Sequence, residues 1–245
     1  MAMQFNRTMM RKPVGSPARS GQVKALDTYR ATYNSLKKRF AVGKSNVIIT
    51  PGYLRSEQVL GTQNQVSFPI LVNEGTAPRS TERRLGISDT FVITDLGIRI
   101  GRLTGAAPQA TPGPIQLESF VNNYVFTVVA EQAALHTFYN GALSVKVGSI
   151  TYIEALDMLR FQQVGTAQRG LSVLAANPYA ASEVKGLSDL ADIVPTIQFS
   201  GQEKNIVQVT LPESAAMGAV APAQNVAVFY ARGFLCQNAA PLLNR

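Results

Sequence analysis

The chain has 245 residues, 46% of them hydrophobic, and a formal net charge of +8, with one cysteine, one histidine and no tryptophan. This length and apolar content are sufficient to bury a sizeable core, which argues against disorder of the whole chain. A single cysteine excludes an internal disulfide framework and any metal site built from several cysteines.

The positive charge is concentrated at the start of the chain. Residues 1–44 carry ten basic side chains against one acid, Asp27, whereas the rest of the chain carries 13 basic and 14 acidic groups. The ten are Arg7, Arg11, Lys12, Arg19, Lys24, Arg30, Lys37, Lys38, Arg39 and Lys44. This asymmetry predicts a basic arm, residues 1–44, that contacts nucleic acid or an anionic membrane, and a body, residues 45–245, of ordinary charge. A solvated tail that only aids solubility is the alternative.

The arm itself has two parts. Residues 1–20 contain Pro, Gly and Ser without hydrophobic periodicity, so we expect them to be mobile in the isolated protein. From Gly21 to Phe40, apolar residues recur at spacings of three and four, which predicts a short basic amphipathic helix. Such a helix lies on a membrane, docks on the body or packs against a neighbouring subunit. No apolar run has the length of a secretory signal or a membrane span, so we expect the chain to be made and kept in a cytoplasm.

After Lys44 the pattern changes to that of β-strands. Segments rich in β-branched and aromatic residues are 46–50, 65–72, 89–103, 119–129, 142–147, 150–155, 196–200, 205–211 and 225–235. The segments around Gly148-Ser149 predict a hairpin in which Val147 faces Ile150 and Val145 faces Tyr152.

Residues 205–211 alternate, with Val207, Val209 and Leu211 on a purely apolar face, as in a half-buried antiparallel strand. Long connections rich in small residues span 104–114, 169–193 and 212–224, and a short helix is expected at 182–193. Regular strands joined by long connections favour an antiparallel β-sandwich or jelly roll.

Candidate catalytic residues are few. The Gly43-Lys44-Ser45 triplet lacks the earlier glycine of a phosphate-binding loop, because Lys38 stands there, and a strand is predicted to follow it. We expect His136 to be a packed ring rather than a general base, and Cys236 to be a buried, inert thiol.

Two carboxylate pairs are candidates for the acid and the nucleophile of a glycosidase-like site. They are Glu154 with Asp157 and Asp89 with Asp95, and solvated surface acids are the alternative interpretation. No cluster of Asp, Glu and His indicates a metal, and no motif indicates a cofactor. We therefore expect a protein that is not an enzyme.

A basic arm, an amphipathic helix and a nearly neutral β-body together resemble the jelly-roll capsid proteins of icosahedral viruses, bacterial viruses in particular. The resemblance covers the whole chain in architecture and includes no signature motif. It implies a subunit that assembles with copies of itself into a shell, as a single elaborated sandwich or a compact double one. It also implies assembly in the host cytoplasm and a place in the virion, with long loops that contact other subunits or other capsid proteins.

In that family the arm faces the genome or an internal membrane, which for this chain implies that Arg7, Arg11, Lys12 and Arg19 point inward. Two other classes stay open. One is a cellular nucleic-acid-binding β-barrel protein, for which the body offers one local concentration of charge, at Arg79–Arg84. The other is a carbohydrate-binding or glycosidase-like β-sandwich, which the absence of tryptophan disfavours.

Overall fold

The computed structural model describes residues 20–40, 46–103, 116–123, 125–162, 190–220 and 223–243, with side chains in the first segment from Tyr29 onward. The chain divides into two compact units, Met1–Arg39 and Phe40–Arg245, and each is described by itself. The segment 1–19, predicted to be mobile, and the connection 104–114 lie outside the described residues.

The described part of the first unit is one helix, α1 (Ser20–Arg39), at the position that the apolar spacing predicts. Lys37, Lys38 and Arg39 are exposed in its last turn. Cations at this end complement the negative pole of the helix dipole.

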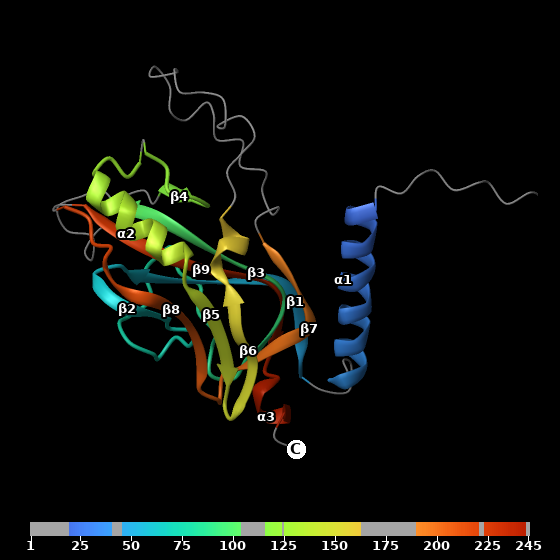
Figure 1. Cartoon of the computed structure of the whole chain (residues 1–245). Helices are drawn as coiled ribbons and strands as arrows, with labels where there is room; N and C mark the ends of the chain where they lie inside the picture. The colour runs from blue at the N-terminus through green and yellow to red at the C-terminus, as the bar shows by residue number, and fades with distance from the viewer. Residues whose placement is uncertain are drawn as a thin grey trace, which may run out of the picture. The chain divides into compact units, whose positions relative to one another are not determined.

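The second unit is mainly β. Its described residues form two antiparallel sheets, one ordered β1-β9-β3-β4 with β7 also paired to β3, and one ordered β2-β8-β5-β6 (Figure 1). The strands are β1 (Ile48–Val59), β2 (Thr62–Phe68), β3 (Thr90–Leu103), β4 (Gln116–Glu118), β5 (Ala142–Val147), β6 (Ile150–Asp157), β7 (Ala191–Ser200), β8 (Asn205–Ala216) and β9 (Gln224–Gln237). The helices of this unit are α2 (Val129–Tyr139), α3 (Ala240–Leu243) and the 3-10 helix η1 (Met158–Phe161).

The strands pair in a nested order. If the short β4 is left aside, the first strand pairs with the last (β1 with β9), and the second pairs with the seventh (β2 with β8). The third pairs with the sixth (β3 with β7) and the fourth with the fifth (β5 with β6). The β3–β9 and β5–β8 pairs then join these four ladders into two sheets.

Side chains from both sheets form one buried core. The apolar face predicted for 205–211 is confirmed, because Val207, Val209 and Leu211 are all buried in this cluster. The rings of Phe68 on β2 and Phe229 on β9 belong to different sheets, and their centroids lie 5.9 Å apart. Burial of aromatic side chains from both sheets supplies much of the driving force for bringing them together.

The predicted hairpin is present, with a different register. Gly148 at its turn has a φ of 57°, which glycine adopts without steric cost. Val147 pairs with Ile150 as expected, but Val145 pairs with Ile153 and not with Tyr152. A β-bulge makes Tyr152 the extra residue on β6.

The strand predicted at 119–129 is wrong. The described residues 119–123 and 125–128 form no strand, and α2 begins at Val129. The Asn122 carbonyl accepts hydrogen bonds from the N–H groups of Val125 and Phe126, which turns the chain out of an extended course. The β-branched residues of this segment therefore lead into a helix that the sequence reasoning missed.

Other boundaries also differ from expectation, among them the end of β2 and the start of β7. β2 ends at Phe68, before Pro69, and the Glu74 carboxylate accepts hydrogen bonds from the N–H groups of Ile70 (2.8 Å) and Leu71 (3.0 Å). These backbone groups are thus unavailable to a longer strand. The helix expected at 182–193 lies mostly outside the described residues, and its last three positions begin β7.

Candidate functional site

The structure describes four of the ten basic side chains predicted to contact a polyanion. Arg30, Lys37, Lys38 and Arg39 are exposed on α1, and the Lys37 ammonium lies 5.3 Å from the ring centre of Tyr33. This distance is within the range of a cation–π contact. The side chains of Arg7, Arg11, Lys12, Arg19, Lys24 and Lys44 lie outside the described residues.

The arginines near the β1 edge are largely engaged within the fold. Arg84 and Glu82 form an ion pair at 3.0 Å in which each side chain is only 1% exposed. Arg84 also donates to the carbonyl oxygens of Glu74 (2.7 Å) and Thr76 (2.9 Å). The Glu82 carboxylate accepts the N–H groups of Glu57 on β1 (2.8 Å) and of Arg79 (2.7 Å), so it fastens this loop to the sheet.

The remaining arginines of this loop differ in exposure. Arg79 reaches the buried carboxylate of Glu57 at 3.5 Å, and Arg55 binds the same carboxylate at 2.8 Å. Arg83 is the exposed member of the predicted cluster, with its guanidinium carbon 5.9 Å from the ring centre of Tyr53. The charged side chains at 79–84 thus mainly form ion pairs and hydrogen bonds that hold the loop in place.

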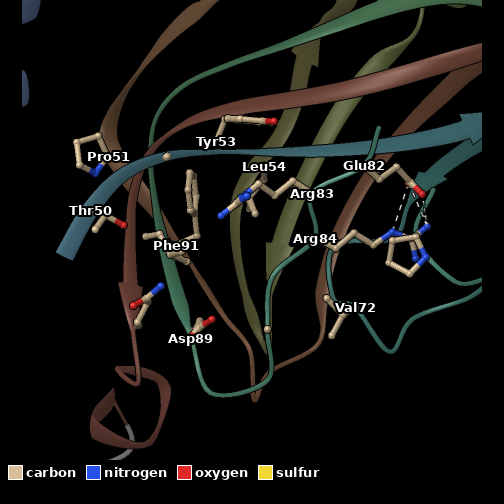
Figure 2. Close-up of a pocket in the computed structure, with 15 residues that line it drawn as sticks. Thr50, Pro51, Tyr53, Leu54, Val72, Glu82, Arg83, Arg84, Asp89 and Phe91 are labelled. Atoms are coloured by element: carbon tan, nitrogen blue, oxygen red, sulfur yellow. Dashed lines mark hydrogen bonds and ion pairs between the residues drawn. The ribbon is translucent and has the colours of Figure 1, made fainter. Parts of the chain in front are cut away.

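A pocket of about 490 Å³ opens beside this loop (Figure 2). Its lining includes the apolar side chains of Leu54, Phe91 and Leu235. Figure 2 shows Glu82 and Arg84 pointing toward each other at its margin, joined by the ion pair described above.

The lining of this pocket does not pair a nucleophile with a base. Its two carboxylates are Glu82, bound by Arg84, and Asp89. Asp89 accepts hydrogen bonds from the Ser88 hydroxyl (3.3 Å) and from the N–H of Asn238 (3.1 Å). The lining thus combines apolar side chains with carboxylates that are engaged in the fold, which is not an arrangement for acid–base chemistry.

The two carboxylate pairs proposed from the sequence differ in geometry. Asp89 immediately precedes β3 and Asp95 lies six positions farther along, so at about 3.3 Å per residue their Cα atoms are roughly 20 Å apart. Glu154 and Asp157 are both exposed on β6 and share its outer face, because a β-bulge lies between Ile153 and Leu156, which both pack against the core. A glycosidase needs carboxyl groups about 5 to 9.5 Å apart on either side of one bond, and Asp89 with Asp95 does not provide this separation.

The structure brings together a different pair, Asp95 and Asp192. They lie directly opposite each other on β3 and β7, and Asp95 also binds Arg232 of β9 at 3.2 Å. The hydrogen bond with Asp95 raises the pKa of Asp192, partial burial and the negative charge of Asp95 add to this, and Arg232 and Arg160 oppose it. Sequence reasoning missed this pair because only the β3–β7 register makes its members neighbours.

The chain has one histidine and one cysteine, and the two side chains differ in burial. His136 is exposed on α2, so the prediction of a packed ring is wrong. Cys236 on β9 is completely buried, which confirms the expected burial of that thiol.

Within the described segments, no group of three or more His, Cys, Asp or Glu side chains is placed to hold a metal ion. None of the helices in the part of the chain that the structure describes is long and apolar enough to cross a membrane. Comparison with known proteins gives no match: no family model, no curated protein and no solved structure is similar to this chain.

Proposed function

We propose that this protein is a structural subunit with a single jelly roll that assembles with copies of itself into a viral capsid. The nested strand order carries the proposal. A jelly roll arises when a long antiparallel hairpin of eight strands rolls up, so that the first strand pairs with the last and each inner pair follows in turn. The four ladders β1–β9, β2–β8, β3–β7 and β5–β6 have this order, and they form two sheets of the kind a sandwich requires.

The same order favours one jelly roll over a compact double one. Within the described segments, all eight long strands belong to a single nested set, and side chains of both sheets enter one buried cluster. Two tandem jelly rolls would require two such sets of strands.

The outer face of the sheet β2-β8-β5-β6 is suited to contact with protein. Gln65, Ser67, Ser144, Gln208 and Thr210 form an uncharged strip on this face through the β2–β8 and β5–β8 registers, and the charged Lys146, Glu154 and Asp157 lie outside the strip. Depletion of charge is typical of the centre of protein–protein interfaces. We propose that this face packs against neighbouring copies in the shell, with other capsid proteins as further partners.

For the arm we propose nucleic acid as the partner, in a virion assembled in the host cytoplasm. The exposed Lys37, Lys38 and Arg39 supply positive charge that suits contacts with phosphates.

Assembly is tested by negative-stain microscopy and light scattering of the full-length protein over a range of concentrations. Closed shells or regular rings are expected, and a Thr210→Glu variant should assemble poorly because it places a charge in the proposed interface. Asn123→Glu, at an exposed position away from this sheet, is the matched control. A protein that stays monomeric at all concentrations overturns the proposal, and if it also binds nucleic acid it belongs to the class of cellular nucleic-acid-binding proteins.

The partner of the arm is tested by the salt dependence of binding. The full-length chain is compared with a variant in which Arg7, Arg11, Lys12 and Arg19 are changed to Gln. If the arm binds phosphates, the slope of log affinity against log salt should flatten by about 0.7 to 0.9 for each phosphate that the variant no longer neutralises. Equal slopes, together with binding of both proteins to anionic vesicles, would assign the helix at 20–39 to a membrane instead.

A further inference from the structure

Four side chains form an alternating square on the outer face of the sheet that contains β1 and β9. In this ladder Tyr53 lies opposite Arg232, and Arg55 lies opposite Tyr230. Residues directly opposite each other share a face, as do residues two apart along a strand. The intervening Leu54 belongs to the buried core, so the square faces away from the core.

Arg83 extends this surface beyond the edge of the sheet. It exchanges two backbone hydrogen bonds with Arg55, at 2.9 and 2.8 Å, and its guanidinium group lies over the Tyr53 ring. The rings of Tyr53 and Tyr230 are stacked, with centroids 5.4 Å apart and an interplanar angle of 17°. We call the five residues Tyr53, Arg55, Arg83, Tyr230 and Arg232 the tyrosine–arginine face.

This face has an excess of positive charge on its β1 side. Arg55 and Arg79 share the single carboxylate of Glu57, and Arg83 lies over an aromatic ring. At the other margin Arg232 is neutralised by Asp95. A nearly neutral body thus gathers guanidinium groups around a tyrosine that is 42% exposed.

The chemistry that fits this surface combines phosphates with flat aromatic rings. Guanidinium groups bind phosphate oxygens through charge-assisted hydrogen bonds, and tyrosines on a rigid sheet stack with nucleobases. A lipid headgroup offers a phosphate but no ring, and a duplex keeps its bases stacked inside. We propose that the tyrosine–arginine face binds single-stranded nucleic acid, independently of the arm and of shell assembly.

The test measures binding of a labelled single-stranded oligothymidylate by fluorescence anisotropy. The full-length chain is used with the four arm substitutions to Gln at residues 7, 11, 12 and 19, which lower the contribution of the arm. Tyr53→Leu should weaken binding at least fivefold, about the contribution of one stacked base at its lower limit. Arg83→Gln should reduce the salt slope by about 0.7, because one phosphate of the single strand is no longer neutralised.

Matched controls lie on the other sheet. Tyr152→Leu removes a tyrosine that is 39% exposed on β6, and Lys146→Gln removes an exposed cation on β5. Both should bind the probe as the parent does, and circular dichroism should show that all four variants are folded.

Ultraviolet crosslinking with mass spectrometry gives a second readout, with adducts expected on β1 near Tyr53 and on β9 near Tyr230. If Tyr53→Leu and Arg83→Gln bind as tightly as their controls, or if the adducts lie elsewhere, the proposal is wrong. It is also wrong if a duplex competes as well as the single strand and Tyr53→Leu has no effect. Shell formation is scored separately by microscopy, so failure of either proposal leaves the other standing.

Discussion

Replacing Glu82 with Gln should destabilise the fold strongly, because Glu82 neutralises the buried Arg84. The two side chains are each 1% exposed, and their charged groups lie 3.0 Å apart. The carboxylate also accepts two backbone N–H groups, from Glu57 and Arg79. Glutamine keeps one acceptor oxygen and loses the charge, so Arg84 is left as a buried cation without an anion.

Removing one partner of a buried ion pair typically costs about 3 to 5 kcal/mol. We expect about 3 kcal/mol here, because Arg84 keeps its bonds to the carbonyl oxygens of Glu74 and Thr76. For a chain of this size, each kcal/mol lowers the melting temperature by about 2 to 4 °C, so the expected fall is about 6 to 12 °C.

The measurement is urea unfolding of Glu82→Gln and wild type followed by far-ultraviolet circular dichroism, with the m-value expected to stay constant. Glu213→Gln, at an exposed site on β8, should change the free energy of unfolding by less than about 0.5 kcal/mol. The double variant Glu82→Gln/Arg84→Met should recover part of the loss, because it leaves no unpaired charge. A loss below about 1 kcal/mol in the single variant would refute the reasoning, as would a double variant less stable than the single one.

Two further predictions concern β3 and its neighbours. Because the pKa of Asp192 is raised, its protonated form contributes stability that is present below the unfolded pKa and is lost as pH rises through the folded pKa. Asp192→Asn should therefore flatten the pH dependence of the free energy of unfolding, measured with urea, above pH 3.8. At pH 7 it should stabilise the protein by less than about 1 kcal/mol, because it removes the repulsion from Asp95. An unchanged pH profile would contradict this prediction. Gly233→Ala should destabilise by about 1 to 3 kcal/mol, because the added Cβ meets the Val92 carbonyl, whereas Gly52→Ala, with its nearest atoms 3.7 Å away, should cost less than Gly233→Ala in the same assay.

The sequence by itself determined the elements whose signal is local. The apolar spacing of 21–40 predicted α1, the alternation of 205–211 predicted the buried face of β8, and Gly148-Ser149 predicted the turn of the β5–β6 hairpin. In each case the signal lies within a few positions of the chain. Apolar residues recur every three to four residues in the helix and every two residues in the strand, and a glycine lies at the turn of the hairpin.

Only the tertiary structure decided where the other elements begin and what they bring together. The β-branched segment before α2 predicted a strand, yet Glu131 in the first turn of the helix binds Arg102 of β3 at 2.8 Å and the N–H of Val220 at 2.8 Å. These partners are distant in sequence and leave no local pattern. The helix is therefore stabilised by contacts that no window around residue 129 contains.

The candidate sites depend on register in the same way. Asp95 meets Asp192, and Tyr53 meets Arg232, because the β3–β7 and β1–β9 ladders align these positions. A shift of either ladder by one residue would move these side chains to opposite faces, although the composition and local pattern of every strand would be the same. Charge in the arm can be read from the chain, but a charged and aromatic surface on a sheet exists only once distant strands have paired.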